Sequence, residues 1–85
     1  MTGIKSYFGG VVIADPELLG GVPVFAGTRV PVEILFQYLP DMNGIEVFLD
    51  EFPSVSPAQV QELLAQLEQV FQAGRLENFH ASIAG

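Results

Sequence analysis

Arg29 is the side chain of this sequence best suited to contact another molecule. It is one of three basic residues in the chain, the others being Lys5 and Arg75. A guanidinium group forms paired hydrogen bonds with carboxylates and phosphates, so Arg29 is a candidate contact to a phosphate, a nucleic-acid base or an acidic partner. The alternative role is structural, with the guanidinium bonding backbone carbonyls or pairing with Asp15 or Glu33. Both roles stay open, and the sequence favours the structural one.

No other set of residues has the spacing of a catalytic, metal-binding or cofactor-binding site. His80 is the only histidine and there is no cysteine, whereas a metal site needs three or four converging ligands. The carboxylates of Asp50–Glu51 are adjacent, so on a helix they point to different faces and cannot act as an acid–base pair. Gly20, Gly21 and Gly27 lack the spacing of a phosphate-binding loop. The sequence therefore predicts a protein that is not an enzyme and uses no cofactor or metal.

Arg29 lies in a segment, residues 20–32, that is dense in glycine and proline. Glycine adopts backbone angles that other residues avoid, and proline fixes φ. Two β-favouring runs, residues 22–25 and 29–32, flank a turn, so we predict a tight strand–turn–strand that leads into a helix. Thr28 is expected to form a hydrogen bond within the turn or at the helix entry rather than to a ligand. The residues assigned to the turn structure are Gly20, Gly21, Pro23, Gly27 and Pro31.

Three helices are predicted after this segment. The first spans residues 31–39 and the second spans residues 44–52, with Asn43 as its side-chain cap. The third begins with a capping box, Ser56–Gln59, and ends at Gly74. Apolar residues recur at helical spacing in each. The predicted buried faces are Val32, Leu35, Phe36 and Leu39 in the first, Ile45, Phe48, Leu49 and Phe52 in the second, and Val60, Leu63, Leu64, Leu67, Val70 and Phe71 in the third.

These elements predict a mainly α fold. A short β-type run at residues 11–13 precedes the punctuated segment, and residues 1–10 are expected to be loosely ordered. The fold then consists of short N-terminal β-strands or a hairpin followed by a three-helix bundle, whose second and third helices form a helix-turn-helix. We divide the chain into an N-terminal extension (1–10), a single domain (11–74) and a C-terminal tail (75–85).

The helix-turn-helix raises the question of DNA binding by the third helix. Gln59 and Glu62 are placed on its outer face, and glutamine can bond adenine. However, the N-terminal half of this helix has no Lys or Arg to anchor phosphates, and Asp50–Glu51 and Glu62 would repel them. DNA binding is therefore expected of a complex with a basic partner more than of the chain alone.

Composition points to association with other proteins. The 85 residues are 49% hydrophobic and only 15% charged, with a mean hydropathy of +0.41. A chain this short forms one domain with a modest core, so we expect it to be a homo-oligomer, to bind a partner protein, or both. A net charge of −7 favours a basic partner. The absence of cysteine and of a signal peptide fits a cytoplasmic protein, and no apolar run is long enough for a membrane helix.

Four short motifs resemble one known family. The chain is similar, over about residues 11–70, to the bacterial and archaeal family catalogued as domain of unknown function 433. The resemblance implies a β-strand N-terminal part, a homeodomain-like three-helix bundle, similarity to VapB-type antitoxins, and pairing with a PIN-type ribonuclease toxin. Residues 40–44 depart from the family's usual Gly-containing turn with a Ser/Thr cap. The motifs are Asp15-Pro16, Gly20-Gly21-Val22-Pro23-Val24, Gly27-Thr28-Arg29-Val30-Pro31-Val32, and Phe52-Pro53 with Ser56.

The leading hypothesis is a non-catalytic antitoxin-like protein that binds and neutralises a PIN-type nuclease. Its tail would contact the nuclease through Leu76, Phe79 and Ile83, or Arg29 or Arg75 would enter the acidic active site. The alternatives are a DNA-binding transcriptional regulator with a helix-turn-helix and a homo-oligomeric interaction domain. The candidate contacts to a partner or to DNA are Thr28, Arg29, Gln59, Glu62, Arg75 and Phe79.

Overall fold

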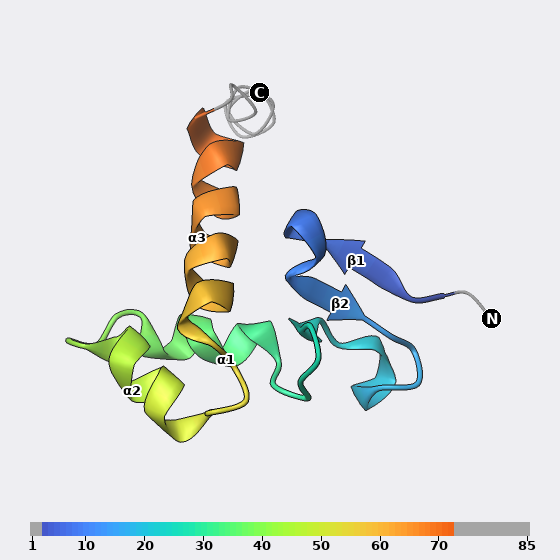
Figure 1. Ribbon diagram of the computed structural model, residues 1–85, viewed down its shortest axis with the longest axis horizontal. Coiled ribbons are helices and arrows are strands. Elements are labelled where there is room, and N and C mark those ends of the chain that lie inside the picture. The colour runs from blue at the N-terminus through green and yellow to red at the C-terminus, as the bar shows by residue number, and fades with distance from the viewer. Residues whose placement is uncertain (1–2, 73–85) are drawn as a thin grey trace, which may run out of the picture.

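The computed structural model describes residues 3–72 and shows a small antiparallel sheet followed by three helices (Figure 1). This confirms the mainly α class with short N-terminal strands. None of the described helices is long and apolar enough to cross a membrane. The predictions that concern Gly74, Arg75, Leu76, Phe79, His80 and Ile83 lie outside the described residues.

The N-terminal sheet has three strands in the spatial order β1-β2-β3, and both pairings are antiparallel. β2 is the run predicted at residues 11–13. The expected loose order of residues 1–10 is wrong for β1, whose backbone pairs with β2 although its side chains are all exposed. A short 3₁₀ turn, η1 (Phe8–Gly10), joins these two strands. The strands are β1 (Lys5–Tyr7), β2 (Val12–Ala14) and β3 (Val24–Phe25).

The segment after β3 forms a loop rather than the second strand predicted at residues 29–32. Its only β-type pairing in the described structure is one isolated bridge between Val24 and Pro31, because α1 (Val32–Tyr38) begins immediately after that proline. The Val32 N–H bonds to the Pro23 carbonyl at 3.0 Å. This hydrogen bond ties the first turn of the helix to the start of the strand.

The other two helices also lie close to their predicted bounds, with α2 at Gly44–Glu51 and α3 at Pro57–Gln72. The predicted cap of α2 is wrong. Asn43 occupies the N-cap, but its φ of 59° is left-handed and its side chain forms no capping bond. Side-chain capping normally requires an extended backbone at this position, which this Asn lacks.

The capping box of α3 is confirmed. The Ser56 Oγ accepts the Gln59 N–H at 3.1 Å, and the Gln59 Oε1 accepts the Ser56 N–H at 3.0 Å. These reciprocal bonds link the two ends of the first helical turn, where backbone donors have few partners within the helix. The start of the longest helix is therefore defined by local side-chain chemistry.

The core joins the sheet to all three helices. The rings of Phe25 and Phe48 lie 5.9 Å apart at its centre, and both side chains are fully buried. Two residues predicted to be buried are exposed: Phe36 by 43% and Phe71 by 59%. In α1 the side chain of Ile34 packs against the core as well. The buried cluster consists of Val12, Phe25, Val30, Leu35, Phe48, Val55, Val60 and Leu63.

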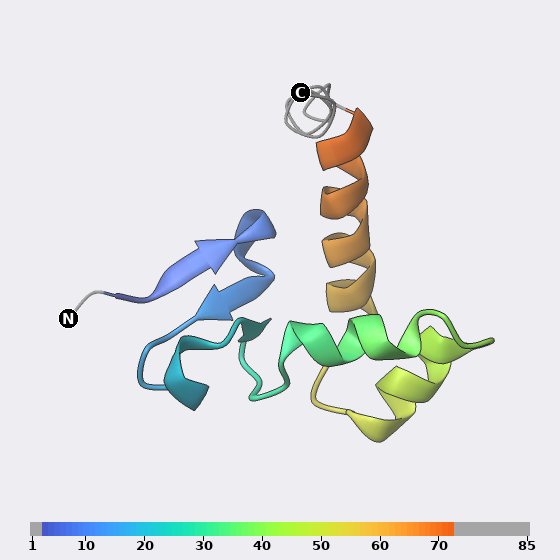
Figure 2. The same ribbon diagram turned by 180° about the vertical axis from the view of Figure 1, so that it is seen from behind.

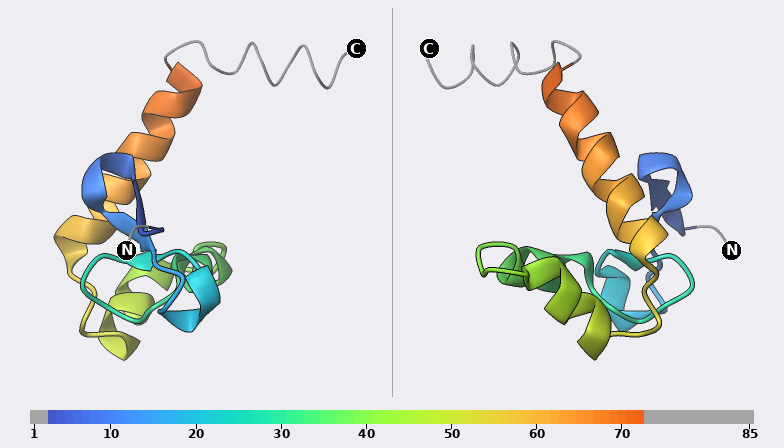
Figure 3. Two further views of the ribbon diagram at one scale, coloured as in Figure 1. Left: turned by 90° about the vertical axis from the view of Figure 1, so that its right-hand side faces the viewer. Right: turned by 60° about the vertical axis from the view of Figure 1, so that its left-hand side comes forward.

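The molecule is open and flat. It measures 41 × 41 × 19 Å and has a radius of gyration of 14.5 Å, whereas a compact domain of this length has about 12 Å. Figure 2 shows α3 and the β1–β2 hairpin rising from the same side of α1. The hairpin contacts α3 through η1, and Figure 3 shows how thin the molecule is. Within residues 3–72, this shape leaves the three residues of β1 and the last two residues of α3 exposed.

Candidate functional site

Thr28 holds the turn that carries Arg29. The Thr28 N–H bonds to the Phe25 carbonyl at 2.9 Å, and Gly27 has a φ of 78°, which is the geometry of a type II turn with glycine at its third position. The buried Thr28 hydroxyl donates to the Phe25 carbonyl at 2.8 Å and accepts the Val30 N–H at 3.0 Å. The prediction that Thr28 bonds within the turn is confirmed.

The turn is also anchored to the sheet and to α3. The Ala26 N–H bonds to the Val11 carbonyl at 2.8 Å, and the Phe25 N–H bonds to the Val30 carbonyl at 3.1 Å. The Gln59 Nε2 donates to the Ala26 carbonyl at 2.9 Å. Two residues far from this loop in the sequence, Val11 and Gln59, therefore hold it, together with Val30 of the loop itself.

Gln59 does not lie free on the outer face of α3, as the sequence led us to predict. Its side chain is half-buried and both of its amide atoms are bonded within the chain, one to the Ser56 N–H and one to the Ala26 carbonyl. Glu62 is exposed and accepts a hydrogen bond from the Gln66 Nε2 at 2.7 Å. Of these two candidate contacts, only Glu62 lies at the surface.

Arg29 is exposed on this anchored loop. Among the described residues, no side-chain hydrogen bond involves its guanidinium. The structural role favoured from the sequence, in which Arg29 pairs with Asp15 or Glu33 or bonds carbonyls, is therefore not seen in this part of the chain. The hydroxyl of Thr28 closes the turn, so the turn does not require the neighbouring guanidinium.

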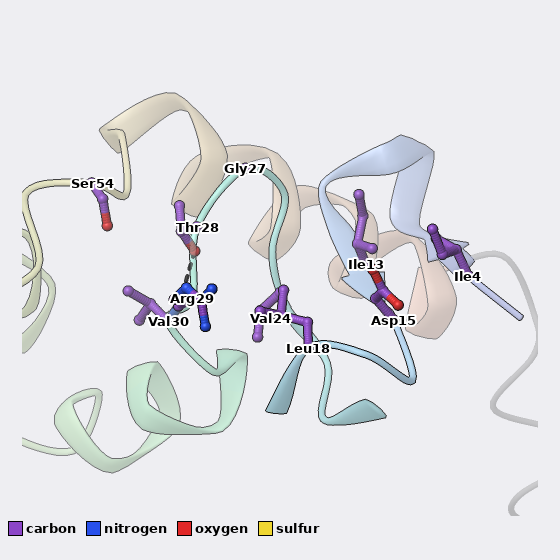
Figure 4. Close-up of a pocket in the computed structure, with 10 residues that line it drawn as sticks. All are labelled: Ile4, Ile13, Asp15, Leu18, Val24, Gly27, Thr28, Arg29, Val30 and Ser54. Atoms are coloured by element: carbon purple, nitrogen blue, oxygen red, sulfur yellow. Dashed lines mark hydrogen bonds between the residues drawn. The ribbon is translucent and has the colours of Figure 1, made fainter. Parts of the chain in front are cut away.

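An open pocket of ≈ 670 Å³ lies beside the Arg29 loop. Figure 4 shows Arg29 and Ser54 toward one end, with Ile13, Asp15 and Ile4 toward the other. The rest of the lining is largely apolar and includes Leu18, Val24 and Val30. The pocket thus combines an apolar wall with a cation near one end and a carboxylate near the other, an arrangement suited to an apolar group that carries polar groups on both sides.

Asp15 is partly committed to its own loop. Its Oδ1 accepts the Glu17 N–H at 2.9 Å, which forms the turn after β2. Sequence reasoning named Asp15 as an ion-pair partner for Arg29 and as part of the Asp15-Pro16 motif, and it did not predict the pocket. The alternation of side chains along a strand was one available signal for the pocket, because neighbouring residues of a strand point to opposite faces. Val12 is buried in the core, and Ile13 accordingly points to the opposite face of β2, where it lines the pocket.

Of the five predicted turn residues, all within the described part of the chain, Gly27 lines this pocket and the other four do not. Gly20 and Gly21 form a 3₁₀ turn, η2 (Leu19–Gly21), and both have positive φ values, 69° and 93°. Pro23 supplies the carbonyl that accepts the Val32 N–H. Gly27 lies at the tip of the Arg29 turn, and Pro31 occupies the N-cap of α1. Their common role in the structure is to shape the backbone.

A separate polar contact joins α1 to α2. The Tyr38 hydroxyl donates a hydrogen bond to the Glu51 carboxylate. This hydrogen bond, together with burial and the negative charge of Glu51, raises the pKa of Tyr38 above its ordinary value. Within residues 3–72, no three acidic or histidine side chains group in a way that would hold a metal ion. The Tyr38 contact is therefore a link between two helices.

Comparisons with known proteins place the chain in a family. Residues 12–65 match the family described as "Protein of unknown function (DUF433)". The chain is also 33% identical over 51 residues to "Uncharacterized protein y4eO" of Sinorhizobium fredii (strain NBRC 101917 / NGR234). That match covers 60% of this chain and 23% of the relative, so the chain corresponds to less than a quarter of that protein. No solved structure matches the chain. Because the family match spans 12–65 of the 85 residues, this chain belongs to the DUF433 family.

Proposed function

We propose that this protein is the non-catalytic, antitoxin-like member of a toxin–antitoxin pair, and that it binds and neutralises a PIN-type nuclease. The observation that supports the proposal most directly is the exposed Arg29, held on a loop anchored to the sheet and to α3. Because the loop is already ordered, binding through Arg29 loses little conformational freedom. A cation presented on an ordered backbone is a suitable inhibitory group.

The chemistry of the proposed partner fits this group. A PIN-type active site, as the family resemblance implies, contains acidic residues that hold a metal. A guanidinium forms bidentate bonds with carboxylates, so Arg29 can pair with those residues and occupy the site. Thr28 is buried beneath it, and its hydroxyl is already bonded. Thr28 therefore contributes by holding the loop and makes no direct contact.

The surroundings of Arg29 provide the rest of the proposed interface. The apolar wall of the adjacent pocket, formed by Leu18, Val24 and Val30, accepts an apolar side chain of the partner. The net charge of −7 attracts a basic nuclease, and such long-range attraction accelerates association. The interface then consists of the Arg29 cation beside an apolar wall, on a chain whose overall charge is negative.

The proposal is tested with the nuclease encoded by the adjacent open reading frame. The two proteins are co-expressed, and growth rescue and affinity capture are measured for the wild type and for Arg29→Ala. Loss of a bidentate, charge-assisted pair predicts roughly 10- to 100-fold weaker binding and loss of rescue. Arg29→Lys should retain part of the affinity, since it keeps the charge but not the fork.

Glu33→Ala serves as the matched control. Glu33 is exposed on the first turn of α1, close to Arg29 in the sequence, and its replacement should leave rescue unchanged. Failure to capture any adjacent nuclease, together with failure to rescue growth, would contradict the proposed function. Capture that is unaffected by Arg29→Ala would contradict the role of Arg29 while leaving the pairing in place.

A second candidate function is DNA-binding transcriptional regulation. It is favoured by the order of α2 and α3, which are joined by the short segment 52–56 as in a helix-turn-helix. The charges oppose it, because Lys5 and Arg29 are the only basic residues within the described range and both lie outside these helices. A mobility-shift assay on the upstream region of the gene decides the matter, with Gln61→Ala as the variant, since Gln61 is exposed on α3. Absence of a shift at low salt would show that the isolated chain does not bind this DNA.

A further inference from the structure

β1 is the outer strand of the sheet. The order β1-β2-β3 leaves one side of Lys5–Tyr7 without a neighbouring strand in the described structure, and all three residues are exposed. Figure 1 and Figure 2 show no other described segment along this side. The backbone N–H and carbonyl groups that point outward there are a template on which another strand can pair.

We propose that a second copy of this chain pairs with this edge, β1 against β1 in antiparallel orientation, with Ser6 on the two-fold axis. The two small sheets then join into one six-stranded sheet. The proposal concerns a different surface from the Arg29 loop, and it does not depend on nuclease binding. It names the partner and the register for the self-association that the apolar composition predicts.

Symmetry restricts the register to a few alternatives. In an antiparallel pair, residues directly opposite each other project from the same face of the sheet. A two-fold axis perpendicular to the sheet must therefore lie midway between the two copies of one residue, which then face each other across the strand pair. For β1 that position is Lys5, Ser6 or Tyr7. Each choice brings different side chains together.

The side chains favour Ser6. An axis at Lys5 places two ammonium groups opposite each other, which is destabilising. An axis at Tyr7 leaves Lys5 opposite the partner subunit's Gly9, beyond the end of the strand. An axis at Ser6 places each Lys5 beside the partner subunit's Tyr7, where a cation–π contact forms. Tyr7 is 44% exposed and so has ring surface available.

The charge distribution of the chain also favours a second copy at this edge. A lysine on an edge strand ordinarily discourages further pairing, but here the opposing tyrosine accommodates it. The strand itself carries one cation and no acid, although the whole chain has a net charge of −7. β1 is therefore a place where two copies meet with little repulsion between acidic groups. Three residues per strand make a small interface, so the dimer is expected to exchange with the monomer.

Cysteine substitution provides a direct test, because the natural chain contains no cysteine. In the proposed register the two Ser6 Cα atoms lie about 4.5–5.5 Å apart, a distance that a disulfide spans. Ser6→Cys should therefore form a covalent dimer under mild oxidation, seen on a non-reducing gel. Two copies of Lys5→Cys, or of Tyr7→Cys, would have Cα atoms about 8 Å apart, which is too far for a disulfide.

Gln61→Cys, on the exposed face of α3, measures the rate of random collision. The proposal requires Ser6→Cys to cross-link faster than each of the other three single variants, and circular dichroism confirms that all four fold. Adding Lys5→Met to Ser6→Cys should slow cross-linking roughly 5- to 30-fold, because both cation–π contacts are lost. Cross-linking of Ser6→Cys no faster than Gln61→Cys, or fastest cross-linking at Lys5→Cys or Tyr7→Cys, would overturn the proposed interface.

Discussion

Replacing Thr28 by valine tests whether a hydroxyl group, rather than side-chain shape, holds the Arg29 loop. Thr28 is 9% exposed, and its hydroxyl bridges the Phe25 carbonyl and the Val30 N–H at 2.8 and 3.0 Å. Valine has nearly the same shape as threonine, so the packing around the side chain is retained. The buried Val30 N–H, however, loses its acceptor. Thr28→Ser provides the opposite change, because serine keeps the hydroxyl and loses the methyl group.

The expected loss of stability follows from these contacts. A buried donor left without a partner costs about 1–3 kcal/mol, whereas the Phe25 carbonyl keeps its bond to the Thr28 N–H. We therefore expect Thr28→Val to lower the free energy of unfolding by about 2 kcal/mol. In a domain of this size that corresponds to a melting temperature lower by roughly 8–16 °C. Thr28→Ser should cost only about 0.8 kcal/mol, the value of one buried methyl group.

Urea unfolding followed by far-ultraviolet circular dichroism measures the effect, since the chain has no tryptophan. The expected order of stability is wild type, then Thr28→Ser, then Thr28→Val, with unchanged m-values. If Thr28→Val is as stable as Thr28→Ser, or more stable, the loop is held by packing and the hydrogen-bond argument is refuted.

Three further predictions concern the same scaffold. Gly44→Ala should destabilise the fold more than Gly27→Ala, although only Gly27 has a positive φ (78°). The reason is that a Cβ at Gly44 would lie 1.8 Å from the Tyr38 carbonyl oxygen, whereas a Cβ at Gly27 would have nothing within 4 Å. Thermal melts that give the reverse order of stability would contradict this. Gln59→Glu should lose stability, by about 1–2 kcal/mol in urea titrations, because the carboxylate keeps the cap but cannot donate to the loop carbonyl; wild-type stability would show that this long-range bond is unimportant. The raised pKa of Tyr38 stabilises the fold at neutral pH, and this stabilisation disappears as pH rises through the raised pKa. Wild type should therefore be more stable than Tyr38→Phe at pH 8 and lose that advantage above about pH 10. If the advantage persists above about pH 10, the hydrogen bond to Glu51 is not the source of the added stability.

Elements held by local interactions could be predicted from the sequence. The capping box of Ser56 and Gln59 acts within one helical turn, and the apolar spacing that follows indicates a helix whatever it packs against. The same holds for α1 and for the turn at Gly27. These predictions needed no knowledge of distant residues, and the structure confirms them.

Elements held by distant residues could not be predicted in this way. β1 has no apolar alternation, and it is a strand because β2 pairs with it. Periodicity also could not tell which members of an apolar stripe are covered, so Phe36 and Phe71 were placed in the core although the open shape leaves them exposed. The second bond of Gln59 spans 33 residues, and no local pattern announces it.

The candidate site divides in the same way. The sequence by itself determined that Gly27, Thr28 and Arg29 lie in a tight turn, because glycine conformations and short-range hydrogen bonds depend on neighbouring residues. Only the tertiary structure decided that Thr28 is buried and bonded while Arg29 is exposed beside a pocket. The reason is that the loop backbone is bonded by the Val11 carbonyl and the Gln59 side chain, so the burial of Thr28 depends on residues that lie far from it in the sequence.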